Sequence, residues 1–170
     1  MMWNQAKSGI LDWERSFRTA HSDTAAEVNP MKISARNILP GTVTAVTKGA
    51  VNAEIALTLR GGETIVGVIT NASVDRLGLE IGTNAFVIIK ASEVMVGKDL
   101  ENAKLSARNI LAGKVAELQD GAVNSEVGIR LPGGTMLIAS ITRESVQALD
   151  LKLNDAVSAV VKASHVMVGI

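Results

Sequence analysis

The sequence SARNIL at residues 34–39 occurs a second time at residues 106–111, which is 72 residues later. Four further segments recur at the same offset of 72 residues: GAVN at 49–52, GG at 61–62, KAS at 90–92 and VMVG at 94–97. Segments that recur at one fixed offset indicate two copies of a single folding unit. We therefore predict two domains, residues 31–98 and residues 99–170, preceded by an N-terminal extension over residues 1–30.

Each copy has the hydrophobic pattern of short β-strands. Residues 51–60 alternate between apolar and polar side chains, a period of two that is typical of a half-buried strand. The Gly-Gly pair then turns the chain into a second expected strand at 64–69, and residues 43–46 and 86–89 supply further strands. Residues 87–89 are apolar on both faces, so we expect the two units to pack together and chains to associate further.

One short helix is expected in each copy. In the first copy it covers residues 71–77, between an N-cap at Thr70 and a stop at Gly78, and its twin begins at Thr142. Gly82 and its counterpart Asn154 both tolerate the left-handed conformation, which indicates a turn. The fold class is therefore all-β with one short helix per repeat, and the strand inventory predicts tandem OB-like β-barrels.

The composition excludes several classes of protein. The 170 residues carry 17 basic and 17 acidic side chains and no cysteine, which removes disulfides, thiolate metal sites and cysteine nucleophiles. After residue 30 the only aromatic residue is Phe86, and with a net charge of zero this argues against an OB-fold nucleic-acid binder. No apolar run reaches the roughly 18 residues that span a bilayer, so we expect a soluble, cytoplasmic protein with no membrane partner.

Residues 1–30 differ from the repeats, because they hold both tryptophans, Trp3 and Trp13, and are weakly helical in pattern from Ile10 to Thr19. Three interpretations stay open for this extension: a docking helix, the remnant of an upstream domain, and leader sequence ahead of a start at Met31. Partial disorder is the ordinary expectation for such a terminus.

A catalytic set is missing from the repeated pattern. The histidines are His21 and His165, and neither is duplicated; Glu54 and Glu126 are the only acidic residues at matching positions. No phosphate-binding Gly-Lys-Ser/Thr loop is present. We therefore expect no enzyme activity, no cofactor and no metal held directly by protein ligands.

The polar residues that both copies share have the chemistry of an anion site, because hydroxyls, amides and cationic side chains donate hydrogen bonds. The predicted set is Ser34, Arg36, Asn37, Asn52, Thr70, Ser73, Lys90, Ala91 and Ser92, with Ser106, Arg108, Asn109, Asn124, Thr142, Ser145, Lys162, Ala163 and Ser164. Most of these side chains also have an ordinary alternative, such as a helix cap, a surface ion pair, a solvated strand end or a turn.

The repeated segments resemble the molbindin (Mop) family. The resemblance rests on Ser-Ala-Arg-Asn, on Gly-Ala-Val-Asn, on Ile-Thr-x-x-Ser-Val-x-x-Leu and on Lys-Ala-Ser-x-Val-Met, each present twice, and it covers residues 31–170. It implies a cytoplasmic protein that binds molybdate and tungstate, with six domains assembled as a homotrimer.

The resemblance also implies where the oxyanions bind, namely at interfaces between domains. One type of site takes the Ser-Ala-Arg-Asn segment of one domain and the Thr, Ser and Lys segments of another, and a second type lies near Asn52 and Asn124. Storage or homeostasis of molybdenum is the function implied first. The alternative is the ligand-sensing module of a molybdate-responsive regulator or of a transport ATPase.

Overall fold

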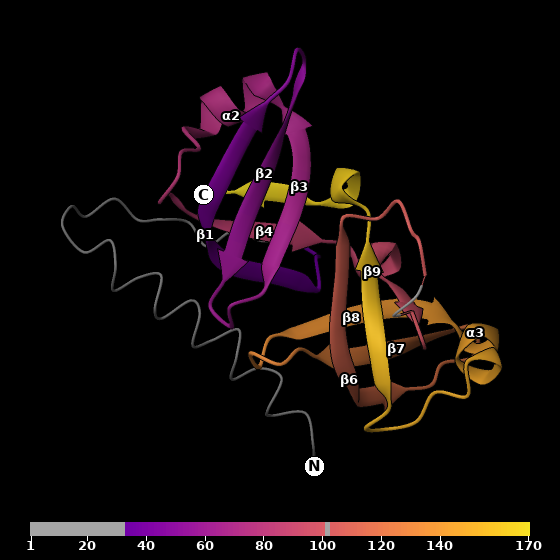
Figure 1. The fold of residues 1–170 in the computed structure, drawn as a ribbon. Helices are drawn as coiled ribbons and strands as arrows, with labels where there is room; N and C mark the ends of the chain where they lie inside the picture. Colours follow the sequence, from indigo (N-terminus) through magenta and orange to yellow (C-terminus); the bar gives the residue numbers. More distant parts are fainter. Residues whose placement is uncertain (1–32, 101–102) are drawn as a thin grey trace. The chain divides into compact units, whose positions relative to one another are not determined.

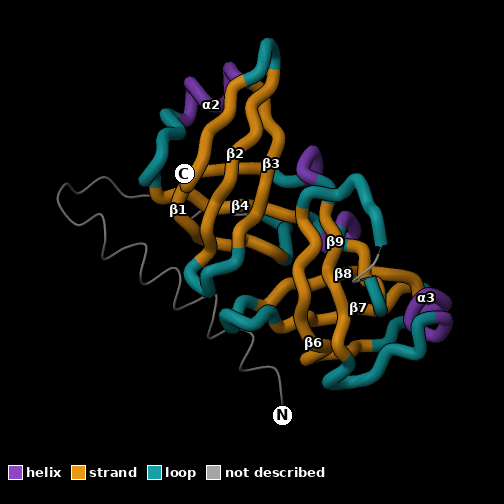
Figure 2. Tube along the Cα trace, in the orientation of Figure 1, coloured by secondary structure: helices purple, strands orange, loops and turns teal. Residues whose placement is uncertain are grey.

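The computed structural model describes residues 33–100 and 103–170, and Ser34–Ile170 form one compact unit. The first repeat contains β1 (Asn37–Lys48), β2 (Asn52–Leu59), β3 (Thr64–Thr70), α2 (Asn71–Leu77), β4 (Asn84–Ile89), the 3-10 turn η1 (Ala91–Glu93) and β5 (Met95–Gly97). The second contains β6 (Asn109–Gln119), β7 (Asn124–Arg130), β8 (Met136–Thr142), α3 (Arg143–Ala148), β9 (Ala156–Val161), η2 (Ala163–His165) and β10 (Met167–Gly169). The two repeats correspond element for element, which confirms the all-β class with one short helix per repeat (Figures 1 and 2).

The alternating pattern places every second side chain in the core. Along β2, Ile55 and Leu57 are fully buried, and the residues between them are half-buried. β1 pairs with β4 through residues 37–42 and with β2 through residues 41–48, and its register with β2 shifts between Val43 and Ala45, a bulge that bends the strand. β6 has the same irregularity between Val115 and Glu117. The bends curl each sheet toward an OB-like barrel.

Both helices begin at the expected threonine, and α2 ends at the expected glycine. Thr70 Oγ1 accepts a hydrogen bond from the Ser73 backbone N–H at 3.1 Å, and Thr142 does the same for Ser145 at 3.1 Å. Gly78 ends α2 in the left-handed conformation with φ 58°, and its counterpart Asp150 has φ 44°. The sequence prediction of an N-cap and a glycine stop is therefore confirmed for α2.

The last strand of each repeat belongs to the sheet of the other repeat. The two sheets have the orders β10-β4-β1-β2-β3 and β5-β9-β6-β7-β8. β10, from the end of the chain, pairs antiparallel with β4, while β5 pairs antiparallel with β9. Figure 1 shows the yellow β10 lying in the indigo and magenta sheet of the first repeat. The sheets therefore do not follow the sequential domain boundary at residues 98 and 99, and neither repeat completes its sheet alone.

The predictions for residues 1–30 lie outside the described residues, and so does His21. In the described part of the chain, no helix has both the length and the apolar character that a membrane span requires.

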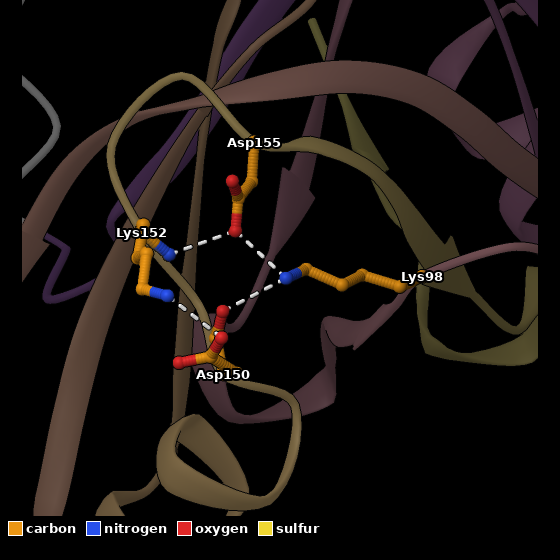
Figure 3. Close-up of polar contacts among 4 residues, drawn as sticks. All are labelled: Lys98, Asp150, Lys152 and Asp155. Carbon is orange, nitrogen blue, oxygen red and sulfur yellow. Dashed lines mark hydrogen bonds and ion pairs between the residues drawn. The ribbon is translucent and has the colours of Figure 1, made fainter.

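The connection between the repeats is fixed to the second repeat by Lys98 (Figure 3). Its Nζ lies 2.7 Å from Asp155 Oδ2 and donates to the Asp150 carbonyl at 2.8 Å. The same Asp155 carboxylate accepts from the Lys152 backbone N–H at 2.9 Å. One carboxylate therefore organises the loop before β9 and attaches the linker to it.

We expect the Asp155→Asn variant to be less stable than the wild type near neutral pH. The hydrogen bond from Lys98, and then that from the Lys152 backbone, hold the pKa of Asp155 below its ordinary value of 3.8. A carboxyl with a lowered pKa stabilises the fold above that ordinary value, and the contribution is lost as the pH falls below it. Urea unfolding at pH 7 should separate wild type from variant, and the difference should shrink at about pH 3. Asp99→Asn is the matched control in the same linker, and an equal loss there would contradict this account.

Candidate functional site

Two of the predicted segments meet at the end of one sheet. Asn37, the first residue of β1, is paired with Ile89, the last residue of β4. The segments 34–36 and 90–92 therefore leave the sheet from neighbouring strands and at the same end. The second repeat has the same arrangement, because Asn109 is paired with Val161. The structure thus brings the Ser-Ala-Arg-Asn and Lys-Ala-Ser segments of the same repeat together, whereas the resemblance implied that these segments come from different domains.

The other repeat covers this end of the sheet. η1 packs against β8, and η2 packs against β3. Arg36 Nη2 lies 2.6 Å from Glu126 Oε1, and Arg108 Nη2 lies 2.6 Å from Glu54 Oε1. Both pairs join one repeat to the other. Each predicted site is therefore built from both repeats, with its basic segments from one and a glutamate on β7 or β2 from the other.

Sequence reasoning missed the part that Glu54 and Glu126 play at these sites. From the sequence alone, two carboxylates without further acidic neighbours support neither catalysis nor metal binding. A signal was present, since they are the only acidic residues that the two repeats share at matching positions. A glutamate paired with each arginine holds the guanidinium in one orientation by a charge-assisted hydrogen bond.

The structure gives Asn37 and Asn109 a structural role in joining the repeats. Asn37 is 1% exposed; its Oδ1 accepts from the Ile138 N–H at 2.7 Å, and its Nδ2 donates to the Ile138 carbonyl at 2.8 Å and to the Ile89 carbonyl at 3.1 Å. Asn109 makes the equivalent bonds to Val66 and Val161. Both amide hydrogens are donated in each case, so neither asparagine has one left for an anion, and we leave both out of the proposed site.

The two other predicted asparagines and the helix-cap hydroxyls lie at one end of the β2–β3 and β7–β8 strand pairs. Asn124 is paired with Thr142, two positions beyond the pair of Glu126 and Ser140, which is about 7 Å along the strand. The Thr142 and Ser145 hydroxyls lie 2.8 Å apart, in the helix cap. In the first repeat Asn52, Thr70 and Ser73 have the same arrangement. The threonine of the first predicted type of site is therefore the strand partner of the asparagine of the second type. In each repeat the threonine and serine hydroxyls of the helix cap are hydrogen-bonded to each other.

Lys90 and Lys162 carry the free positive charge of the two predicted sites. Both side chains are exposed, and within the described residues neither has a carboxylate oxygen within 4.0 Å. The hydroxyl residues beside them are exposed as well: Ser34, Ser92, Ser106 and Ser164. Ala91 and Ala163 are buried and anchor η1 and η2. An exposed ammonium beside several hydroxyls suits a small oxyanion, which accepts hydrogen bonds from all of them.

Among the described residues, no group of three or more His, Asp or Glu side chains is placed so that it could hold a metal ion. A cavity of about 320 Å³ lies elsewhere, between the two Gly-Gly turns, and is lined chiefly by Leu39, Pro40, Leu59 and Arg60. It contains none of the predicted site residues.

Comparison with known proteins gives one domain family. Residues 33–96 and residues 105–168 each match the TOBE domain. A solved structure of the cytoplasmic molybdate-binding protein ModG, with molybdate bound, aligns with a TM-score of 0.80 at 45% sequence identity, covering 82% of this chain and 99% of that one.

Curated relatives have related names. The molybdenum-pterin-binding protein MopA of Rhodobacter capsulatus is 42% identical over 161 residues, which are 95% of this chain and 58% of MopA. The molybdenum transport protein ModE of Herbaspirillum seropedicae is 40% identical over 140 residues, 82% of this chain and 52% of ModE. A probable molybdenum-pterin-binding protein of Haemophilus influenzae is 46% identical over 67 residues, 39% of this chain and 97% of that protein. This chain thus spans a little over half the length of MopA and of ModE.

Proposed function

Because the chain belongs to the TOBE domain family, and resembles molbindins as its repeated motifs predict, we propose that it binds molybdate, and tungstate by the same chemistry. The observation that carries the proposal is that Arg36 and Lys90 adjoin the paired residues Asn37 and Ile89, as Arg108 and Lys162 adjoin Asn109 and Val161, at sheet ends covered by the other repeat. ModG, described as a molybdate-binding protein, matches both repeats at 45% identity.

The proposed ligand set uses charge and hydroxyls rather than metal coordination. Lys90 and Lys162 supply the positive charge, and the serines beside them supply hydrogen-bond donors. Arg36 and Arg108 are held by their glutamates and line the same sheet ends. A dianion is stable out of bulk water only when several donors surround it. The role is binding without catalysis, in storage or homeostasis of molybdenum in the cytoplasm.

The sites are completed by neighbouring chains in a homotrimer. Support comes from exposed apolar side chains that recur at matching positions in both repeats. Val51 and Val123 are 71% and 74% exposed, and Ile81 and Leu153 are 73% and 59% exposed. Exposed apolar side chains at repeated positions are typical of surfaces that become buried when subunits associate. An oxyanion that bridges two chains would then couple binding to assembly.

Calorimetric titration with molybdate, on protein whose mass in solution has been measured, tests the proposal. We expect binding of more than one anion per chain, with little change when sulfate is present in excess. An absence of heat on a correctly assembled trimer would contradict the proposal and make the repeated motifs structural.

The Lys90→Ala and Lys162→Ala variants should each bind molybdate roughly tenfold more weakly at the affected sites, because a charge-assisted hydrogen bond is lost. Their mass in solution should not change, since both side chains are exposed and unpaired among the described residues. Lys114→Ala is the matched control, because Lys114 is also exposed but lies within β6, away from the sheet end. Unchanged affinity and stoichiometry in both site variants would remove the lysines from the site.

A sensing role is the second candidate, favoured by the 40% identity with ModE, of which this chain spans 52%. In that case the two repeats would be the ligand-reading half of a regulator or of a transport ATPase. Pull-down of partners from an extract, with and without molybdate, separates the two roles. Retention of a partner only in the presence of molybdate would favour sensing over storage.

A further inference from the structure

The two repeats contact each other through a reciprocal interface. Arg36 pairs with Glu126, and Arg108 pairs with Glu54, each at 2.6 Å. The amide of Asn37 bonds the main chain of β8, and that of Asn109 bonds the main chain of β3. Contacts that occur twice with the partners exchanged define a two-fold relation between the repeats.

These reciprocal contacts do not determine which repeat pairs with which. Each repeat carries both halves of every such contact, an arginine and a glutamate, an asparagine and an edge strand. Two first repeats from different chains could make the same set, since Arg36 of one would meet Glu54 of the other. Something else must favour the pairing of unlike repeats within one chain.

Near a two-fold axis a residue meets its own counterpart, and there the two repeats differ. Glu63 and Thr135 are counterparts, and Glu63 accepts hydrogen bonds from the Gly133 N–H at 2.7 Å and from Thr135 Oγ1 at 3.3 Å. Glu93 and His165 are also counterparts, and their Oε2 and Nδ1 atoms lie 2.6 Å apart. Both contacts join an acceptor carboxylate to a donor.

Pairing of like repeats would lose this complementarity. Two first repeats would bring Glu63 to Glu63 and Glu93 to Glu93, so two pairs of carboxylates would lie close together. Like charges placed opposite each other are a recognised means of excluding a wrong partner. Two second repeats would have no carboxylate at either position.

A third contact, away from the axis, is also lost when like repeats pair. Lys98 pairs with Asp155 at 2.7 Å, but the counterparts of these two residues are Ile170 and Thr83. A pair of first repeats would set Lys98 against Thr83, and a pair of second repeats would set Ile170 against Asp155. The ion pair therefore forms only between a first and a second repeat (Figure 3).

We propose that the contacts of Glu63 with Thr135, Glu93 with His165 and Lys98 with Asp155 form a selector that makes each first repeat take a second repeat as its partner and rejects a like repeat of another chain. The selector matters because β5 and β10 are exchanged between repeats, and exchanged strands that pair between chains lead to cross-linked assemblies. With the selector in place, like repeats of two chains do not exchange strands, and the linker places the second repeat of the same chain within reach of each first repeat.

Disulfide reporters in the full chain test the selector, because the natural sequence has no cysteine. Met95→Cys with Val160→Cys reports unlike pairing, since these residues are directly opposite across β5 and β9. Met95→Cys with Ile88→Cys reports pairing of first repeats, because Ile88 is the counterpart of Val160 and within one chain it lies opposite Met167. Chains are unfolded in urea and refolded at about 1 mM, a concentration at which repeats of other chains compete with the repeat that the linker holds nearby. The refolded protein is then oxidised with diamide and separated on non-reducing denaturing gels.

The selector is removed by Thr135→Glu, His165→Glu and Asp155→Thr together, which give the second repeat the residues of the first. We expect covalent dimers from the like-pair reporter to rise by roughly fivefold or more over the wild-type background. Lys48→Thr is the matched control, because it breaks an exposed ion pair with Asp75 inside one repeat and should leave the dimer fraction unchanged. An unchanged fraction in the triple variant, with the unlike-pair reporter still closing within the chain, would overturn the proposal and leave the linker as the cause.

A second variant guards against loss of folding in the first. His165→Glu alone changes one exposed side chain and should also raise the dimer fraction. Adding Glu93→His exchanges the two residues and restores a donor opposite a carboxylate, so the fraction should return to the wild-type value. A fraction that stays high in this exchanged variant would count against the selector.

Discussion

Replacement of Asn37 by alanine should lower the free energy of unfolding of the whole two-repeat unit by about 3–5 kcal/mol, because one buried side chain forms three hydrogen bonds to the main chain. Its removal leaves the Ile138 N–H, the Ile138 carbonyl and the Ile89 carbonyl without that partner. Equilibrium unfolding in urea, followed by circular dichroism, measures the change. We expect a single transition shifted to lower denaturant, since each sheet contains a strand from both repeats.

Asn84→Ala is the matched control for this variant. Asn84 is an exposed asparagine on the neighbouring strand, and among the described residues its side chain accepts only from Thr42 Oγ1, at 3.3 Å. Its loss should change stability by less than about 0.5 kcal/mol. A similar small effect for Asn37→Ala would show that the amide does not hold the two repeats together. Asn109→Ala should repeat the large effect, because its bonds to Val66 and Val161 are equivalent.

Replacement of Gly133 by alanine should lower the free energy of unfolding by about 3 kcal/mol, because the new methyl group has no room. A Cβ at Gly133 would lie 2.0 Å from the Gly61 carbonyl oxygen and 2.4 Å from the Gly61 Cα. These are backbone atoms of the facing turn and cannot rotate away. The two turns would have to separate, which would also break the hydrogen bond from the Gly133 N–H to Glu63. Thermal and urea unfolding provide the measurement.

Pro132→Ala tests whether the effect belongs to this contact rather than to the turn in general. Pro132 is the exposed neighbour in the same turn, and its replacement should cost at most about 1 kcal/mol, through the greater freedom of the unfolded chain. Equal losses in the two variants would mean that the close approach of the turns is not what Gly133 provides.

Local structure followed from the sequence because it depends on neighbouring residues. The alternation at residues 51–60 predicted β2, and the threonine before Asn71 with the glycine at 78 predicted the start and the end of α2. Sequence identity between the copies predicted that the second repeat would have the same elements. The exchange of β5 and β10 was not predictable in this way, because an edge strand pairs equally well with either sheet as far as its own residues are concerned.

For the candidate site, the sequence identified the residue types but not which of them remain free to bind. Arginine, lysine and serine at repeated positions indicated anion chemistry. The structure showed that Asn37 and Asn109 use their amides within the protein, and that Arg36 and Arg108 face glutamates. A hydrogen-bond partner far away in the sequence is fixed only when the strands are in place, so this distinction depends on tertiary structure.

The sequence by itself determined that this protein has two copies of one all-β unit, and that their shared polar residues have the chemistry of an oxyanion site. Periodicity, turn residues and duplication are properties of the chain, and they act over a few residues. Only the tertiary structure decided that each sheet takes a strand from the other repeat and that both candidate sites contain residues of both repeats. The physical reason is that paired edge strands and buried amides satisfy backbone groups at least 43 residues away in the chain, where no local pattern specifies the partner.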